Sequence, residues 1–347
     1  MTPKLVLPPN FVPIDTGRVE DALAARWQTP DHDAGPAVHA CTLNLIACVE
    51  DAAATAAVSA IVDQLAATHP IRAVTIVTDE AAEANRIQAW VAAGSAAAPG
   101  SQISSEEITL FAQPDDTELL AATVEGMLAA DLPAYFWWRG GSPTRDHTFS
   151  ALARLANKIV VDSIRFGDGA AALDTVRRLL DYRDGRAGVA DLNWVRTAPW
   201  REAVAACFDD PEALALLPLF DRASINYASG PEGALPPSAR ALLISGWLAS
   251  RLNRLRGRVR LKPVVEAGHG PGRVLKVSLS SRASPAALEL ERRPAPTGVV
   301  AVAKDQSGRT IREWLFPTTT LSEAELLHRS IDSPARDPLL EAALHHD

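Results

Sequence analysis

The stretch HACTLNLIACVEDAAATAAVSAIVDQLAATHPIRAVTIVTD, residues 39–79, sets the fold class of this chain. It joins an apolar segment, an alanine-rich segment that opens on an acidic residue, and a second apolar segment. Short uninterrupted apolar runs are typical of strands covered on both faces, and an acidic residue favours a helix N-terminus. The order therefore predicts strand, helix and strand, the unit from which parallel α/β sheets are built.

The same alternation continues downstream to residue 166. We expect a helix at 81–93, a strand at 106–113, a helix at 116–132, an aromatic strand at 134–140, a helix at 146–157 and a strand at 158–166. The connections between these segments are short, as they are in doubly covered α/β domains. The first half of the chain is therefore predicted to be an open, mainly parallel sheet with helices on both faces.

The second half mixes helices with strands and then changes texture. We expect helices at 170–182, 199–208 and 237–252, and strands at 189–196 and 221–229. Four strand-like stretches follow residue 257 with no helix between them: RVRLKPVVE, RVLKVSLSS, AALELERR and VVAVAKDQSGRTIREWLF. Neighbouring strands joined this way pair as antiparallel meanders, and DQSG at 305–308 is the expected turn of the last one. A final helix is expected at 320–331, where Thr320 and Glu323 have capping-box spacing.

These patterns divide the chain into three parts. Residues 1–36 are rich in proline and read as an extended arm with one short helix at 19–27, which either packs on its own domain or reaches for a partner. Residues 37–166 form the α/β domain. Residues 167–347 form a mixed α+β domain that ends in the antiparallel meander.

Charge is distributed unevenly along the chain. The net charge is −8, but residues 1–130 carry 5 Lys and Arg against 17 Asp and Glu, whereas residues 131–347 carry 29 against 25. The acidic front half repels phosphate groups, so we expect no binding to nucleic acid or to a membrane surface. No apolar run approaches the length of a membrane span or of a signal peptide. We therefore expect a soluble, cytoplasmic protein.

The three cysteines point to the same compartment. Cys41, Cys48 and Cys207 form an odd, sparse set without CxxC spacing, which indicates free thiols and no disulfide framework. Cys41 and Cys48 are seven residues apart, so in a strand they face opposite sides and do not pair.

Common catalytic motifs are missing from the sequence. It contains no P-loop, no HExxH and no GxSxG. Its histidines are scattered and, apart from the terminal HHD at 345–347, none stands at metal-ligand spacing from a cysteine or carboxylate; that terminus reads as a solvated chain end. We accordingly predict no catalytic residue, no metal and no cofactor.

Two places remain candidates for binding an anion. The turn between Gly140 and His147 follows a strand end, where open α/β sheets hold ligands, although the position of Asp146 favours a role as the N-cap of the next helix. The segment 251–262 holds six positive residues and no acidic one. It is either a solvated sheet face or a site for an acidic protein patch or a sugar phosphate. Its candidate side chains are Arg254, Arg256, Arg258, Arg260 and Lys262.

Four aromatic-rich phrases carry a resemblance to a known family. LPAYFWWRGGSP (132–143), KIVVDSIRF (158–166), ADLNWVRTAPWRE (190–202) and SGWLASRL (245–252) resemble the signature stretches of the glucose-6-phosphate dehydrogenase assembly protein family, also called OpcA. The resemblance implies a two-part, non-catalytic protein that binds glucose-6-phosphate dehydrogenase and supports the oxidative pentose phosphate pathway. It would do so by binding the active, oligomeric form of the enzyme better than the inactive form.

The same phrases supply the residues expected to make or support the partner surface. They are rich in Trp and Arg, the side chains most enriched at binding hot spots, although a Trp in a strand is more often a core residue. The set comprises Trp137, Trp138, Arg139, Asp191, Asn193, Trp194, Arg196, Trp200 and Arg201. The alternative function is a metabolite sensor that holds an anionic sugar phosphate or nucleotide at one of the two anion candidates.

Overall fold

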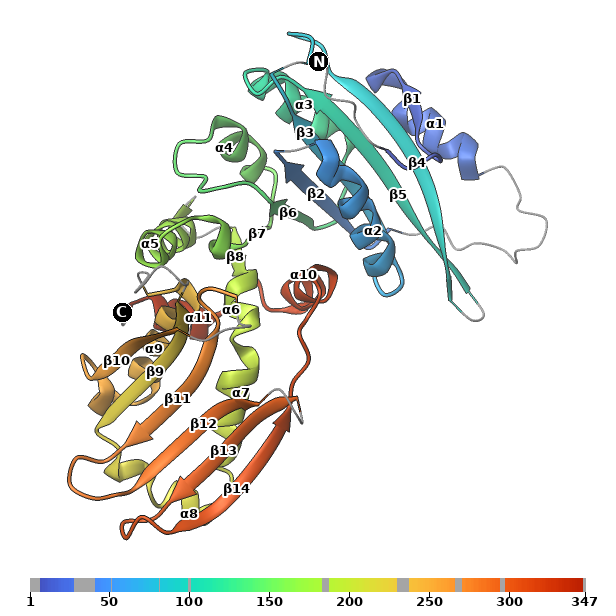
Figure 1. Ribbon diagram of the computed structural model, residues 1–347. Coiled ribbons are helices and arrows are strands. Elements are labelled where there is room, and N and C mark those ends of the chain that lie inside the picture. Colours follow the sequence, from blue (N-terminus) through green and yellow to red (C-terminus); the bar gives the residue numbers. More distant parts are fainter. Residues whose placement is uncertain are drawn as a thin grey trace. The chain divides into compact units, whose positions relative to one another are not determined.

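The computed structural model describes residues 7–27, 41–50, 52–80, 82–98, 101–182, 187–229, 237–265, 270–293 and 297–345 (Figure 1). Residues 1–6 and 28–36 of the predicted arm, and the ends of several predicted elements, lie outside this range. Two compact units are present. Unit 1 consists of Met1–Arg165, Tyr182–Ala190 and Glu323–Ala335, and unit 2 of Phe166–Asp181, Asp191–Ser322 and Arg336–Asp347.

Unit 1 is built on an eight-stranded sheet with the order β1-β4-β5-β3-β2-β6-β7-β8. Its strands are β1 (Val12–Ile14), β2 (Leu43–Val49), β3 (Ile71–Thr78), β4 (Gln88–Ala98), β5 (Ser101–Ala112), β6 (Ala134–Trp138), β7 (Lys158–Val161) and β8 (Gly188–Asp191). The pairs from β5 through β3, β2 and β6 to β7 are parallel. Every residue of β2 is buried, as in a strand covered on both faces. The predicted mainly parallel sheet is confirmed.

Five α-helices accompany this sheet in the described part of unit 1. They are α1 (Val19–Trp27), α2 (Thr55–Ala66), α3 (Thr117–Met127), α4 (His147–Ala153) and α10 (Glu323–Asp332). The described part of the predicted arm, residues 7–27, packs on its own domain. Its strand β1 pairs antiparallel with β4, and α1 contacts β4 as well.

The helix predicted at 81–93 is wrong. The described residues from 82 onward run through a turn into β4, which pairs antiparallel with β5 from Gln88 to Ala98. Asn85 adopts the left-handed conformation with φ of 56°, which a right-handed helix cannot contain, and its N–H donates to the Asp116 carboxylate at 2.9 Å. Pairing with a distant strand has overridden the local helix propensity of the alanines.

Unit 2 is built on a six-stranded sheet with the order β10-β9-β11-β12-β13-β14. Its strands are β9 (Arg222–Ser229), β10 (Val259–Val265), β11 (Val274–Ser280), β12 (Ala287–Arg293), β13 (Gly298–Lys304) and β14 (Thr310–Pro317). Strands β11 to β14 form the predicted antiparallel meander, and Gly308 takes a positive φ in the expected turn.

The stretch RVRLKPVVE, predicted as the first strand of that meander, forms β10 and does not take part in the meander, so this part of the prediction is wrong. Strand β10 pairs parallel with β9, and β11 pairs with the other edge of β9. Helix α9 (Ala239–Arg251) connects β9 to β10, and a strand that returns over a helix runs parallel to the strand it left. Strand β10 is consequently an edge strand beside β9.

Helices cover one face of this sheet. Those of unit 2 are α5 (Gly169–Leu180), α6 (Leu192–Arg196), α7 (Ala198–Cys207), α8 (Pro211–Leu214), α9 and α11 (Pro338–His345). Helices α7, α8 and α9 contact β13, β14 and β9 (Figure 1). Along β9 the buried residues Ala223, Ile225 and Tyr227 alternate with more exposed ones. The polar side chains that alternate with them lie on the opposite face of the sheet. Among the described helices of the whole chain, none combines the length and hydropathy of a membrane-spanning segment.

Close packing of α9 on α11 depends on a glycine. A Cβ at Gly246 would collide with the carbonyl oxygen of Ala343, which is backbone and cannot rotate away. We therefore expect Gly246→Ala to destabilise unit 2 by about 1–3 kcal/mol, although alanine gains about 1 kcal/mol in helix propensity. The midpoint of urea denaturation measures this loss.

A second glycine provides the control. Nothing lies within 4 Å of a Cβ placed at Gly126 in α3, so Gly126→Ala is expected to be neutral or stabilising by up to about 1 kcal/mol. If Gly246→Ala is as stable as Gly126→Ala, helices α9 and α11 do not approach each other this closely.

Candidate functional site

The tryptophans of β6 are packed inside unit 1. Trp137 is 0% exposed, and Trp138 is buried with its Nε1–H donating to the Gly141 carbonyl at 2.8 Å. The Arg139 guanidinium lies 5.1 Å from the centre of the Trp137 ring and donates to both oxygens of Glu323, at 3.0 and 2.9 Å. A bidentate Arg–carboxylate pair fixes both partners, so Arg139 ties β6 to the start of α10.

This ion pair explains where α10 begins. The helix starts at Glu323 and not at Thr320, so the predicted capping box is wrong. The Glu323 carboxylate lies at the helix N-terminus, where negative charge is favourable, and it is engaged by Arg139. A tertiary partner has therefore taken the role that the local motif assigned to a cap.

The turn after β6 uses its polar groups internally. The Asp146 carboxylate accepts the Phe149 N–H at 2.7 Å, which confirms Asp146 as the N-cap of α4. Glu50, at the end of β2, accepts the Gly141 N–H at 3.1 Å. A Cβ at Gly140 would collide with Glu50 and with the Trp138 ring. The Glu50 carboxylate thus joins the turn after β2 to the turn after β6, and the Trp138 indole braces the second turn.

The phrase DLNWVR turns sharply, and the strand predicted at 189–196 ends at Asp191. The Asp191 carboxylate accepts the Asn193 N–H at 2.9 Å and so caps α6, which begins at Leu192. Asn193 is buried, and its side-chain oxygen accepts from Arg240 on α9 at 2.8 Å. Both side chains therefore position α6.

Trp194 is the centre of a second aromatic cluster. It is 4% exposed, and its Nε1–H donates to the Asp337 carboxylate at 2.7 Å. The Arg201 guanidinium lies 3.5 Å from the centre of the Trp194 ring, and burial lowers the pKa of Arg201 to about 10. This stack is a cation–π contact in a largely desolvated place.

The remaining members of the predicted set complete this picture. Trp200 is buried on α7, with the guanidinium of Arg292 5.7 Å from its ring centre. Arg196 and Arg201 are half-buried. The four tryptophans of the set are buried, and a role at or beneath a partner surface stays a prediction for the whole set. The unit 1 and unit 2 clusters belong to separate compact units, and each is described by itself.

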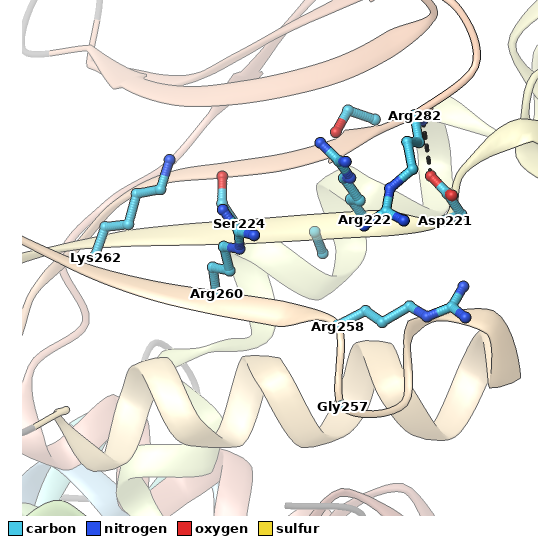
Figure 2. A pocket seen from close by; sticks show the side chains of 10 residues that line it. Asp221, Arg222, Ser224, Gly257, Arg258, Arg260, Lys262 and Arg282 are labelled. Atoms are coloured by element: carbon cyan, nitrogen blue, oxygen red, sulfur yellow. Dashed lines mark hydrogen bonds between the residues drawn. The ribbon is translucent and has the colours of Figure 1, made fainter.

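A cavity of about 460 Å³ opens on unit 2 where β9, β10 and β11 begin or end (Figure 2). Three of the five cations predicted for an anion site, Arg258, Arg260 and Lys262, line this cavity. The other two do not: Arg254 donates to the Pro218 carbonyl, and Arg256 is not a lining residue. We call this feature the cationic cavity. Its lining residues are Asp221, Arg222, Ala223, Ser224, Gly257, Arg258, Arg260, Lys262, Ser280 and Arg282.

Two of its cations, Arg222 and Arg282, were missed by the sequence interpretation. Strand register brings them in: Arg260 pairs with Ser224, and Ser280 pairs with Arg222. The Ala223 N–H donates to the Arg258 carbonyl at 3.3 Å, which places Arg258 beside the start of β9. The only local signal was alternation of Arg222, Ser224 and Asn226 with apolar residues along one strand.

A small cluster in unit 1 also escaped the sequence search. His69 Nε2 lies 3.1 Å from one oxygen of Asp332, and His328 Nδ1 lies 3.2 Å from the other. Their ligand atoms lie within 4.8 Å of one another, so these three side chains could hold a divalent ion. Sequence spacing does not reveal this cluster, because His69 is far from His328 and Asp332 of α10 along the chain. Of the terminal HHD, residues 346–347 lie outside the described range.

All three cysteines are free thiols, as predicted. Burial raises the pKa of Cys41 to about 11, with the nearby Glu106 carboxylate adding to the effect, and raises that of Cys207 to about 12. Burial also raises the pKa of Cys48 far above its usual range. Thiols held in the protonated form are poor nucleophiles.

The mainly parallel sheet of unit 1 and the six-stranded sheet of unit 2 define a two-unit α/β protein. The solved glucose-6-phosphate 1-dehydrogenase of Mycobacterium avium shares this fold with a TM-score of 0.51 and 13% identity, over 88% of this chain and 91% of that chain. At this identity the likeness concerns the fold alone.

The chain belongs to the OpcA family of glucose-6-phosphate dehydrogenase assembly proteins. Residues 62–178 match the family's N-terminal domain and residues 187–344 match its C-terminal domain, and both domains carry the description "Glucose-6-phosphate dehydrogenase subunit". The resemblance found in the sequence is confirmed.

Relatives in two cyanobacteria carry the description "Putative OxPP cycle protein OpcA", where OxPP denotes the oxidative pentose phosphate cycle. The protein of Nostoc punctiforme is 36% identical over 152 residues, which is 43% of this chain and 30% of that protein. The protein of Synechocystis sp. is 32% identical over 197 residues, 56% of this chain and 39% of that protein. The matched region thus spans less than half the length of either relative.

Proposed function

We propose that this protein is a non-catalytic assembly factor that binds glucose-6-phosphate dehydrogenase and favours its active, oligomeric form. The observation that carries the proposal is the match of both halves of the chain to domains described as belonging to a subunit of that enzyme. A factor of this kind acts through a binding free energy that differs between two states of its partner. It needs a recognition surface and no nucleophile.

The sheet of unit 1 supports the non-catalytic part of the proposal. Open α/β sheets bind dinucleotides where the strand order reverses, and here that point lies between β2 and β6. A dinucleotide site needs a glycine-rich turn after the first strand, to let the pyrophosphate approach the helix N-terminus. No glycine occurs between residues 37 and 93, and Glu50 directly follows the first strand instead.

The geometry at this point agrees with the sequence. The Glu50 carboxylate accepts the Gly141 N–H, and the Trp138 ring packs close to Gly140. A carboxylate and an indole therefore take the space and the donors that a pyrophosphate would need. These residues do not fit a nicotinamide dinucleotide, which supports a role without one.

Addition of this protein to the dehydrogenase of the same organism tests the proposal. We expect a lower half-saturation point for glucose 6-phosphate or a higher maximal rate, saturating as more protein is added, together with co-elution on a sizing column. The protein alone should not reduce NADP. No change in the kinetics and no co-elution would refute the proposal, and NADP reduction by the protein alone would refute its non-catalytic part.

Arg196→Ala is the first variant to examine for partner contact. Arg196 is half-buried on the short helix α6, next to the packed Trp194. We expect the variant to weaken dehydrogenase binding by about tenfold, as loss of an interfacial arginine commonly does, with little change in melting temperature. Titration calorimetry and thermal unfolding measure the two effects.

The control is Arg178→Ala, which removes an exposed arginine of α5 in the same unit. It should leave both binding and melting temperature unchanged. A parallel loss of binding and stability in Arg196→Ala would make Arg196 a structural residue.

A further inference from the structure

We propose that the cationic cavity of unit 2 is a binding site for a small, hydroxylated metabolite that carries two phosphate groups and no aromatic base. This site goes beyond the assembly role, because it needs no partner enzyme. Three features of the cavity support it: the convergence of positive side chains, the absence of ion pairs between them and carboxylates of the described residues, and the chemistry of the lining.

Five cations from three separate stretches of chain line one hollow. Arg258, Arg260 and Lys262 come from β10 and the turn before it, Arg222 from β9, and Arg282 from the segment after β11. Figure 2 shows these side chains extending from the neighbouring strand ends, with Arg258 on the other side of the β9 ribbon from Arg222 and Arg282 in this view. A solvated sheet face would spread its cations over the surface, whereas these gather at one corner of the sheet.

Carboxylates of the described residues leave the five cations unneutralised. Within the described parts of the chain, none of the five lies within ion-pair distance of a carboxylate. Asp221 is the single acidic lining residue, and its carboxylate accepts the backbone N–H of Arg282 at 2.9 Å. Like charges on adjacent strands destabilise a sheet, so this arrangement costs free energy until an anion is bound.

The spacing of the cations suits two phosphate groups. Residues two apart in a strand lie about 6.6 Å apart on the same face. One phosphate can therefore meet Arg222 and Arg258 at the end of the strands, and a second can lie between Arg260, one step along β10, and Lys262, two steps along. Arginine recognises phosphate by paired hydrogen bonds, and lysine does so as a point charge.

The rest of the lining indicates what joins the two phosphates. No aromatic side chain is among the lining residues, so a nucleotide base would find no stacking partner. Ser224, Ser280 and Asp221 offer hydroxyl and carboxylate groups that suit sugar hydroxyls. A cavity of about 460 Å³ is within the range of small-ligand sites. These features favour a sugar bisphosphate over a nucleotide.

Titration calorimetry of the full chain without the dehydrogenase tests the site. The probes are fructose 1,6-bisphosphate, inorganic phosphate, AMP and a hexaglutamate peptide. We expect the bisphosphate to bind at one site per chain and more tightly than the other three, with an affinity that falls as salt is added. Arg222→Gln and Arg260→Gln should each weaken it by about tenfold, and the double variant by about 100-fold.

Arg178→Gln is the matched control, because it removes a positive charge of unit 2 outside the cavity, and it should leave the affinity unchanged. The cavity variants are expected to melt no lower than the parent at low salt, since they relieve like-charge repulsion. Bisphosphate binding that survives the double variant would overturn the proposal. Tighter binding of AMP would overturn the ligand class, and binding of hexaglutamate alone would identify a docking site for an acidic protein segment instead.

If no bisphosphate binds to the cationic cavity, the proposed assembly role is unaffected, because the binding experiment contains no dehydrogenase.

Discussion

Trp194→Ala is expected to lower the free energy of unfolding of unit 2 by about 3–5 kcal/mol, the range for removal of a buried Trp ring. The ring is 4% exposed, donates its N–H to Asp337 at 2.7 Å and carries the Arg201 guanidinium 3.5 Å from its centre. Alanine removes all three contacts at once. Burial already lowers the pKa of the Arg201 guanidinium. The alanine variant also removes the aromatic ring whose cation–π contact offsets the cost of burying this charge.

Trp194→Phe is the control that separates the ring from its N–H. Phenylalanine keeps an aromatic face under Arg201 but cannot donate to the Asp337 carboxylate, so a loss of about 1–2 kcal/mol is expected. Urea denaturation followed by tryptophan fluorescence and by circular dichroism gives both values. If Trp194→Ala costs less than about 1 kcal/mol, the ring is a surface group, and contact with the dehydrogenase becomes its assigned role.

Glu107→Gln is expected to stabilise unit 1 by roughly 3 kcal/mol near pH 8 and to have little effect near pH 5. The pKa of Glu107 is raised from 4.5 to about 7, chiefly by burial; a hydrogen bond from Ser59 opposes the rise and the nearby Asp63 carboxylate contributes to it. The folded state therefore binds more protons than the unfolded state between these pH values. The stability that Glu107 contributes at low pH is lost as the pH rises through about 7. The glutamine side chain of the variant does not ionise, so the variant does not lose this stability.

The neighbouring carboxylate provides the control for this prediction. Glu106 accepts from Arg72 Nε at 2.6 Å, so its charge is compensated. Glu106→Gln should destabilise unit 1 at both pH values, because it leaves a largely buried arginine with one partner fewer. Urea denaturation midpoints at the two pH values measure both variants. A Glu107→Gln variant that is less stable than the parent near pH 8 would contradict the prediction and show that the ionised carboxylate is stabilised by more than the Ser59 hydrogen bond.

Elements whose signals are local could be read from the sequence. The strands β2, β3 and β6 have continuous apolar runs, and the helices α2, α5, α7 and α9 have their expected positions within a few residues. Errors arose where a distant contact determined the outcome. The alanines after Asn85 became β4 because β5 lies alongside, and β10 left the meander because α9 carries the chain back beside β9.

The candidate sites show the same division. The phrase DLNWVRTAPWRE identified the family, but it could not tell a contact ring from a packed one, since burial depends on elements such as α11 that come more than a hundred residues later. Three of the five cavity cations could be found from the basic run at 251–262. Arg222 and Arg282 could not, because only strand register places them beside Arg258.

The fold class, the order of most elements, the free thiols and the family all follow from the amino-acid sequence alone. Each of these rests on residue type and short-range periodicity, which the chain carries locally. Three features depend on the folded chain: the burial of the tryptophans, the occupation of the turn after β2 by Glu50 and Trp138, and the sharing of one cavity by five cations. These are properties of side chains brought together from distant parts of the chain, and no local pattern encodes such distances.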